Sequence, residues 1–254
     1  MTGSLSMIFI DQTVVSVALP VMQRDLGVSQ SGLQWIVNAY VLALASTVAL
    51  GGKLGDSLGR VRAFITGVIL FAIASTICGF APNQMILIAA RVFQGVAAGL
   101  MIPASAAIVV DSFDIHERGK AMAIYVGVAQ AFLAIGPLLG GALTEYLSWR
   151  WVFWINIPVG IVAIVLTYLS KPLQTISEKQ KVDLRYALML ILGLVGLVVG
   201  IQQGHTFGWT SYLTLGLIFG GLLMLTLFAY IQTKSEKPLI QFRLFDDPAF
   251  TADT

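Results

Sequence analysis

The sequence predicts an all-α polytopic membrane protein, and two observations support this fold class. Hydrophobic residues make up 57% of the 254-residue chain, charged residues make up only 11%, and the mean hydropathy is +0.86. An ordinary soluble domain carries about 25% charged residues. In addition, the charged residues occur in clusters separated by apolar runs of about 20 residues, the length that an α-helix needs to cross a bilayer.

Charges, prolines and polar clusters divide the chain into eight predicted membrane-spanning helices. Their expected bounds are 4–22, 33–53, 62–81, 85–109, 121–145, 151–170, 185–203 and 211–231. Among the first four helices, Arg24 follows the first, Lys53 ends the second and Arg62 begins the third. A polar stretch after Pro82 separates the third helix from the fourth, which ends before Asp111.

The last four helices are delimited in the same way. Lys120 precedes the fifth helix, and Arg150 lies between the fifth and the sixth. The longest internal polar stretch, from Lys171 to Arg185, separates the first six helices from a final pair. We therefore predict a six-helix N-terminal bundle, a cytoplasmic linker, an additional transmembrane helix pair and a cytoplasmic tail. The expected bounds of these parts are 1–170, 171–184, 185–231 and 232–254.

The positions of the basic residues predict how the chain is oriented in the membrane. Of the 15 Lys and Arg residues, only Arg24 and Arg150 lie in connections on one side, and Arg91 lies inside a helix. All the others lie in connections on the opposite side or in the tail. Because cytoplasmic connections retain Lys and Arg, we predict that both termini are cytoplasmic.

The composition excludes several other classes of protein. The net charge of +2 does not provide the basic surface that nucleic-acid-binding proteins need. Cys78 is the only cysteine, which excludes a disulfide within one chain and a cysteine-based metal site. The sequence contains no phosphate-binding G-x-x-x-x-G-K-[ST] loop and no nucleophile with a matching base and orienting acid. We therefore expect no enzyme activity, no metal and no cofactor, and the lipid bilayer is the expected partner.

The connection between the second and third predicted helices combines glycines with charges. Gly52 and Gly59 permit a tight turn and a close approach of the two helices. Asp56, which has Arg60 and Arg62 nearby in the sequence, is able to form ion pairs that hold helix ends together. An ordinary basic cytoplasmic loop is the alternative interpretation.

Two charged residues are predicted to lie inside the membrane. Asp11 belongs to the first apolar run and Arg91 to the fourth. A charge at this depth is costly unless it is neutralised, hydrated or paired, so it indicates a functional site. We hypothesise that Arg91 faces Asp11 in the interior of the bundle. The structural alternatives are that Asp11 only bonds a neighbouring helix and that Arg91 only anchors helix ends.

Five motifs follow one another along the chain. They are Ile10 to Pro20, G-x-L-x-D-x-x-G-R from Gly52, R-x-x-Q-G from Arg91, G-P-x-x-G-G from Gly136, and the stretch from Trp149 to Gly160. This ordered set resembles the motifs of the major facilitator superfamily, and in particular of its fourteen-helix drug:proton antiporter branch of multidrug efflux permeases. The resemblance covers essentially the whole chain, which looks like the N-terminal portion of such a protein. The last two helices resemble an extra pair in this branch, and the tail resembles the lead-in to a C-terminal bundle that the chain lacks.

The resemblance implies a function and a location. It implies a proton-coupled secondary transporter, a multi-pass protein of the bacterial inner (plasma) membrane, that exports drugs or other hydrophobic or cationic small molecules by alternating access. Asp11 and Arg91 would couple protons to the substrate. The connection from Gly52 to Arg62, together with Asp111, would form a cytoplasmic gate.

The resemblance also implies two further groups of residues. A tight hinge in the fifth helix would consist of Gly127, Gly136, Pro137, Gly140 and Gly141. A substrate cavity would be lined by Asn38, Tyr40, Gln94, Gln130 and Phe132. Helix packing and interhelical hydrogen bonds are the alternative uses of such residues.

A second functional interpretation follows from the missing bundle. The chain is then a truncated or split transporter half that inserts into the membrane but is inactive without a C-terminal partner. A separately encoded C-terminal half, or a second copy of this chain, would supply that partner.

Overall fold

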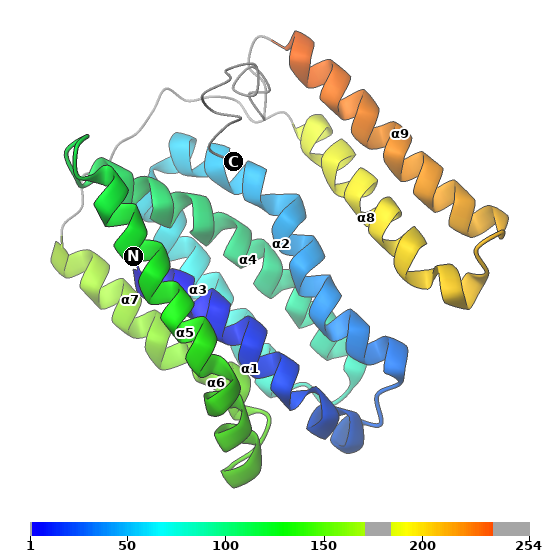
Figure 1. The fold of residues 1–254 in the computed structure, drawn as a ribbon, viewed down its shortest axis with the longest axis horizontal. Helices are drawn as coiled ribbons and strands as arrows, with labels where there is room; N and C mark the ends of the chain where they lie inside the picture. Colours follow the sequence, from blue (N-terminus) through cyan, green and yellow to red (C-terminus); the bar gives the residue numbers. More distant parts are fainter. Residues whose placement is uncertain (1, 171–183, 236–254) are drawn as a thin grey trace. The chain divides into compact units, whose positions relative to one another are not determined.

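The computed structural model describes residues 2–170 and 184–235, and the regular structure in these ranges is entirely helical, which confirms the predicted fold class (Figure 1). The helices are α1 (Thr2–Leu26), α2 (Gln30–Leu58), α3 (Arg60–Gly79), α4 (Gln84–Asp111), α5 (Arg118–Tyr146), α6 (Trp151–Trp154), α7 (Asn156–Ser170), α8 (Leu184–Phe207) and α9 (Tyr212–Lys234). The predicted linker lies almost entirely outside the described residues, as does the predicted tail after Ser235.

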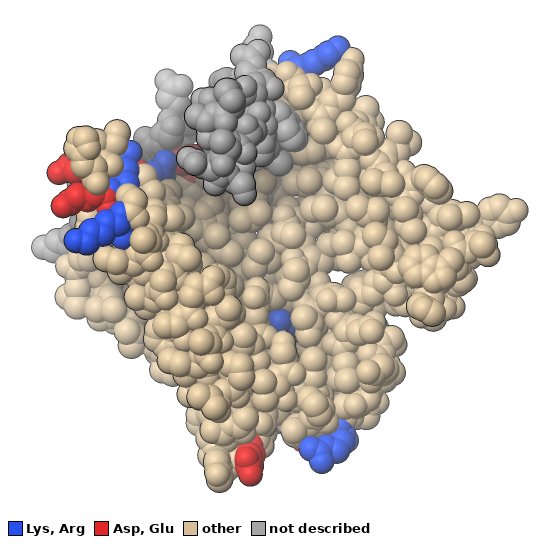
Figure 2. All heavy atoms as spheres, in the orientation of Figure 1, with Lys and Arg blue, Asp and Glu red and all other residues tan. Residues whose placement is uncertain are grey.

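Within the described ranges, eight helical segments are long and apolar enough to cross a membrane, as the sequence predicted. The short helix α6 and helix α7 together form one of these segments, Trp151–Ser170. On the face drawn in Figure 2, charged side chains gather towards the ends of the helices, and the surface between them is almost entirely uncharged. This distribution suits a protein whose middle section lies in hydrocarbon.

The prediction of a loop between the second and third helices is wrong. Helix α2 continues to Leu58 and α3 begins at Arg60, so Gly59 alone separates them. Gly59 has a positive φ of 98°, which favours glycine, and its N–H donates to the carbonyl oxygen of Gly55 at 3.0 Å. Charged residues mark where a helix leaves the hydrocarbon of the membrane. The backbone hydrogen bonds of the helix continue beyond that point, into the membrane–water interface. Helices therefore extend beyond the apolar runs.

Polar side chains cap several helices where the chain enters the membrane. Ser29 accepts a hydrogen bond from the backbone N–H of Gly32 at 3.1 Å at the start of α2. Asn83 accepts one from Ile86 at 3.0 Å at the start of α4. Such caps satisfy backbone donors that the first helical turn leaves free, and they fix where each helix begins.

The chain divides into two compact units, residues 1–180 and 181–254, which we describe separately. In the first unit, α4 packs against both α2 and α3, and α1 packs against α5 (Figure 1). Glycines allow α2 and α4 to approach closely, since a Cβ added to Gly51 would overlap the carbonyl oxygen of Gly99. In the second unit, α8 and α9 form a hairpin, and a Cβ added to Gly221 on α9 would lie 2.7 Å from the backbone nitrogen of Leu197 on α8.

The apolar residues of α1 near Asp11 belong to two apolar clusters of the first unit. One cluster includes Met7 and Ile8 of α1, and the other includes Ile10 and Val14. Asp11 follows Ile10 directly in this helix and has no exposed surface. The packing therefore encloses one carboxyl group in an apolar interior.

Candidate functional site

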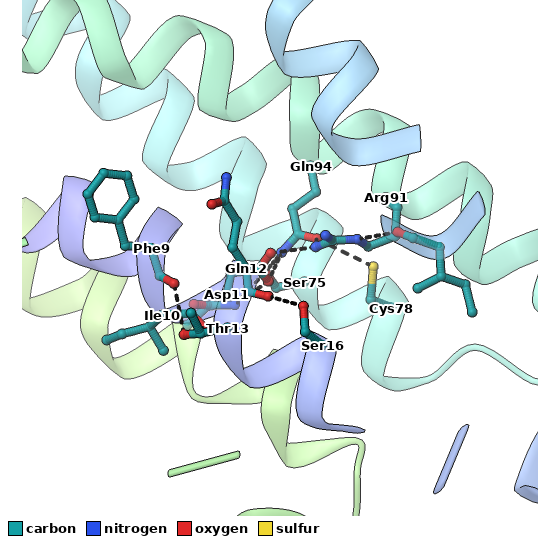
Figure 3. Close-up of polar contacts among 12 residues, drawn as sticks. Phe9, Ile10, Asp11, Gln12, Thr13, Ser16, Ser75, Cys78, Arg91 and Gln94 are labelled. Atoms are coloured by element: carbon teal, nitrogen blue, oxygen red, sulfur yellow. Dashed lines mark hydrogen bonds and ion pairs between the residues drawn. The ribbon is translucent and has the colours of Figure 1, made fainter. Parts of the chain in front are cut away.

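The centre of the first unit is a buried ion pair. Nη1 of Arg91 on α4 lies 2.5 Å from Oδ2 of Asp11 on α1, and the two side chains are 1% and 0% exposed (Figure 3). The structure therefore brings together the two residues that the sequence placed inside the membrane. A buried pair of this kind tolerates the loss of one partner poorly, because the remaining charge is left without compensation.

Arg91 has three further partners, which come from α2 and from its own helix. Its Nε donates to the backbone carbonyl of Ile36 at 3.0 Å, and its Nη1 donates to Oε1 of Gln94 at 2.7 Å. Its guanidinium carbon lies 4.1 Å from the centre of the Tyr40 ring. These contacts stabilise the guanidinium group by hydrogen bonding and by cation–π attraction in addition to the carboxylate.

The second oxygen of Asp11 faces neutral donors. Nε2 of Gln94 donates to Oδ1 of Asp11 at 2.9 Å, and Nδ2 of Asn156 on α7 donates to the same oxygen at 3.3 Å. Both amides also donate to Oγ of Ser75 on α3, at 2.7 Å from Gln94 and 3.3 Å from Asn156. We name Asp11, Arg91, Gln94, Ser75 and Asn156 the central polar cluster.

The central polar cluster joins four transmembrane helices, α1, α3, α4 and α7, and its contact with Ile36 adds a fifth, α2. Its two charges cancel, and its carboxylate accepts hydrogen bonds on both oxygens. The cluster is therefore a charged, hydrogen-bonded centre inside the bundle, and a change in either charge would alter the contacts among these helices.

A second ion-pair network connects three helix ends on the predicted cytoplasmic side. Nε of Arg60, at the start of α3, lies 3.2 Å from Oδ1 of Asp56 on α2. Nη1 of Arg60 also donates to Oδ2 of Asp111 at the end of α4. The structure thus brings together these three residues of the predicted gate. The side chains of Arg60 and Asp111 are each 25% exposed, so solvent reaches this network.

Two further residues of the predicted gate have other surroundings. Arg62 is exposed, takes part in none of the ion pairs found among the described residues, and lines a small cavity of about 300 Å³ with Leu58 and Thr66. Gly52 lies on α2, where an added Cβ would make an ordinary contact with Pro103 at 3.7 Å. Their role in gating stays a prediction.

The predicted hinge residues of α5 lie on two different sides of that helix. A Cβ added to Gly136 would overlap Oγ1 of Thr13 on α1, and one added to Gly140 would lie 3.0 Å from Cα of Val14. Gly127 and Gly141 have open space around the position of a Cβ, and Pro137 is exposed. The first two glycines permit the close packing of α1 and α5. Gly127 and Gly141 do not take part in that contact.

The five residues of the predicted cavity have different surroundings in this structure. Tyr40 and Gln94 are fully buried beside Arg91, Asn38 is half-buried, and Gln130 is exposed. Phe132 lines a separate cavity of about 350 Å³ together with residues of α1 and α7. A shared substrate site for these five residues stays a prediction. Among the described residues, no three His, Cys, Asp or Glu side chains lie together as a metal site would require.

Sequence comparison decides the family. Residues 1–242 match the Major Facilitator Superfamily. The chain belongs to the major facilitator superfamily. This membership assigns the chain to transporters rather than to enzymes, as the sequence predicted, and with the eight apolar helices it identifies an integral multi-pass membrane protein.

Several relatives from the superfamily are named for drug resistance or drug export. The chain is 38% identical to the puromycin resistance protein pur8 of Streptomyces alboniger, over 92% of this chain and 46% of that protein. It is 33% identical to the multidrug transporter protein MdtP of Bacillus subtilis, over 95% of this chain and 45% of that protein. It is 37% identical to the cephamycin export protein CmcT of Amycolatopsis lactamdurans, over 95% of this chain and 51% of that protein. The chain thus spans about half the length of these relatives.

Solved structures of other transporters share the fold. A crystal structure of a peptide transporter in complex with sulfate aligns with 92% of this chain and 51% of its own, with a TM-score of 0.68 and 17% identity. The inward-open structure of the xylose transporter XylE of E. coli aligns with 90% of this chain over 64% of its own length, with a TM-score of 0.55 and 14% identity. At this identity the comparison supports the fold and says nothing of the substrate.

Sequence reasoning missed two members of the central polar cluster. Asn156 lay in a motif that we quoted only for its resemblance, although it is a strongly polar residue in an otherwise apolar run. That isolation is the signal that would have identified it. Ser75 carried no such signal, because serines in membrane helices often bond their own backbone, as Ser6 does to the carbonyl oxygen of Thr2.

Proposed function

We propose that this chain forms the N-terminal part of a proton-coupled exporter of drugs or other hydrophobic or cationic small molecules. The observation that carries the proposal is the buried ion pair between Asp11 and Arg91, because it is the site best suited to take up a proton inside the membrane. The drug-export names of relatives at 33–38% identity support the substrate class.

Protonation of Asp11 is the coupling step in this proposal. While Asp11 is ionised, its attraction to Arg91 and its hydrogen bonds hold α1 against α4. Once Asp11 is neutral, that attraction is lost, whereas Arg91 keeps the Ile36 carbonyl, Gln94 and the Tyr40 ring as partners. The two protonation states therefore favour different packing of α1, and the proton gradient shifts the population between them.

The cytoplasmic network acts as the gate in this proposal. Arg60 connects Asp56 on α2 with Asp111 on α4, so it holds three helix ends in one arrangement. Its partial exposure permits water to replace these contacts when the helices move. Because the basic connections lie at this end, the same proposal places both termini in the cytoplasm and the chain in a bacterial inner membrane.

Alternating access requires a second bundle that moves against the first. The chain spans about half the length of these relatives, and we also consider one alternative. In that alternative, the chain inserts but transports only when a separately encoded C-terminal half or a second copy of the chain supplies the other bundle. The two versions differ in whether the chain transports alone.

Proteoliposomes that contain the purified chain and a trapped fluorescent hydrophobic cation test the proposal. An acidic external buffer drives protons inwards, and we expect the cation to leave as the protons enter. Asp11→Asn should abolish this efflux, because the buried carboxyl group is lost. Asp114→Asn is the matched control, since Asp114 is exposed and lies outside both ion-pair networks found among the described residues.

Reconstitution with a second bundle separates the alternatives. If the chain alone gives no efflux while its helices remain intact, the C-terminal half of MdtP is added to the same vesicles. Efflux that appears only then, and again requires Asp11, supports the split-transporter version. Absence of proton-driven efflux from both preparations contradicts the proposed function.

A further inference from the structure

The side chain of Asn156 has one buried atom without a partner. Its Nδ2 donates to Oδ1 of Asp11 and to Oγ of Ser75, each at 3.3 Å. Its Oδ1 is buried and accepts no hydrogen bond, and the residue is only 1% exposed. A buried acceptor without a donor is unfavourable, so this position calls for a physical explanation.

We propose that Asn156 responds to the protonation state of Asp11 by turning its amide group through half a turn, an inference that rests on the proposed proton coupling. In the orientation that the structure holds, the amide donates to an ionised carboxylate. The half turn exchanges Nδ2 and Oδ1, which are nearly identical in size. The amide oxygen then lies where the nitrogen was, beside Asp11 and Ser75.

Each orientation matches one state of Asp11. An ionised carboxylate only accepts hydrogen bonds, so it requires the amide nitrogen. A protonated carboxyl group has an O–H that needs an acceptor, and the turned amide of Asn156 provides its oxygen. The proton comes from the solution and stays on Asp11, so only hydrogen bonds are exchanged. In both orientations the other amide atom occupies the position that lacks a partner.

The other neighbours of Asn156 suit both orientations. The Ser75 hydroxyl accepts from Nε2 of Gln94 at 2.7 Å, and it accepts from the amide nitrogen of Asn156 or donates to its oxygen. The titratable groups around Asp11 are Arg91 on α4, Tyr40 on α2 and Cys78 on α3. Helix α5 contributes none between residues 126 and 144, and α7 contributes only the neutral amide.

The place of Asn156 in the chain gives the turn a structural consequence. Asn156 is the first residue of α7, and Ile155 separates it from α6. The amide therefore lies where one membrane span is interrupted, and it contacts α1 and α3. Each protonation state of Asp11 would thus give a different set of hydrogen bonds between the start of α7 and its neighbours.

Infrared difference spectra of the whole chain in lipid vesicles, recorded between alkaline and acidic buffer, test this inference. The chain has only three asparagines, Asn38, Asn83 and Asn156, so ¹³C labelling of the asparagine carboxamide gives few bands. We expect a carboxylic acid band that is lost in Asp11→Asn. We also expect a shift of a labelled amide carbonyl band that appears over the same pH range as the acid band.

Variants assign the amide band to one residue. Asn156→Leu keeps a similar volume, and it should remove the amide shift. Asn83→Ser keeps a capping oxygen at the start of α4, and it should leave the shift unchanged. Asp11→Asn should also remove the shift, because residue 11 then no longer gains or loses a proton to which the Asn156 amide responds. The pH-dependent shift of the labelled amide band is measured in the unaltered chain, so it does not depend on whether any variant folds.

Each outcome is decisive. An amide shift that depends on both Asp11 and Asn156 supports the inference. An acid band from Asp11 without any labelled amide shift, or with a shift that persists in Asn156→Leu, overturns the inference and leaves proton binding by Asp11 intact. The absence of any Asp11 acid band from a helical chain overturns the proposed proton coupling itself, and the inference with it.

Discussion

Replacing Arg91 by methionine removes the positive partner of a carboxylate that has no exposed surface. Removing one member of a buried pair typically costs about 3–5 kcal/mol, because the other charge is left uncompensated. This range applies here because Asp11 is 0% exposed and Arg91 is its one cationic partner among the described residues. We therefore expect Arg91→Met to lower the free energy of unfolding by about 3–5 kcal/mol.

A double variant distinguishes the loss of the ion pair from the loss of packing. Replacing a buried pair by apolar residues of similar volume is often neutral or stabilising. The variant Asp11→Leu/Arg91→Met should therefore recover most of the stability that Arg91→Met loses. The exposed Arg24 provides the control, since Arg24→Met should change the free energy of unfolding by no more than about 0.5 kcal/mol.

Labelling of Cys78 measures how readily the bundle unfolds. This residue is the only cysteine and it is fully buried, so a thiol-reactive dye labels it only when the bundle opens. Titration with denaturant in detergent, followed by both dye labelling and circular dichroism, yields the free energy of unfolding. Equal stability of Arg91→Met and Arg24→Met would show that the buried ion pair does not stabilise the bundle. The same conclusion would follow if the double variant lost as much stability as Asp11→Leu and Arg91→Met lose in total when made separately.

Two further predictions concern glycines. Gly136→Ala should destabilise the chain by about 1–3 kcal/mol, because the new methyl group overlaps Thr13 on α1, whereas Gly141→Ala should have little effect because its side is open. Thermal unfolding of the two variants measures the difference, and equal melting temperatures would contradict the close packing of α1 and α5. Gly59→Ala should cost about 1–3 kcal/mol because its φ of 98° disfavours a Cβ, and Gly119→Ala, which has open space, should not destabilise the chain. If both alanine variants unfold at the temperature of the unaltered chain, the tight turn between α2 and α3 is not under this constraint.

Sequence reasoning identified the parts of this protein that have a strong physical signal. The apolar runs predicted the number of membrane-length helices, because nothing else in a globular chain needs so many uninterrupted apolar residues. Asp11 and Arg91 were recognisable as partners because each is a charge inside such a run. Asp56, Arg60 and Asp111 were grouped through the family resemblance, and the structure brings them together.

Other features lacked such a signal. Hydropathy does not show where a helix ends in the interface, so the turn at Gly59 was expected to be a longer loop. The sides of a helix become distinguishable only when its neighbours are known, which is why Gly136 and Gly141 were assigned the same role. The ring of Tyr40 lies against the guanidinium group of Arg91, a contact between two helices that no spacing along one helix reveals.

The central claim is that Asp11 couples proton movement to drug movement, and the most direct test is to record protons while a drug gradient is imposed. Vesicles with a trapped pH indicator contain the chain, with the C-terminal half of MdtP where transport requires it, and hold a hydrophobic cation at high concentration inside. We expect outward movement of the cation to acidify the interior, and Asp11→Asn to abolish this change. Outward movement of the cation at the same rate without acidification would show that Asp11 does not couple proton movement to drug movement.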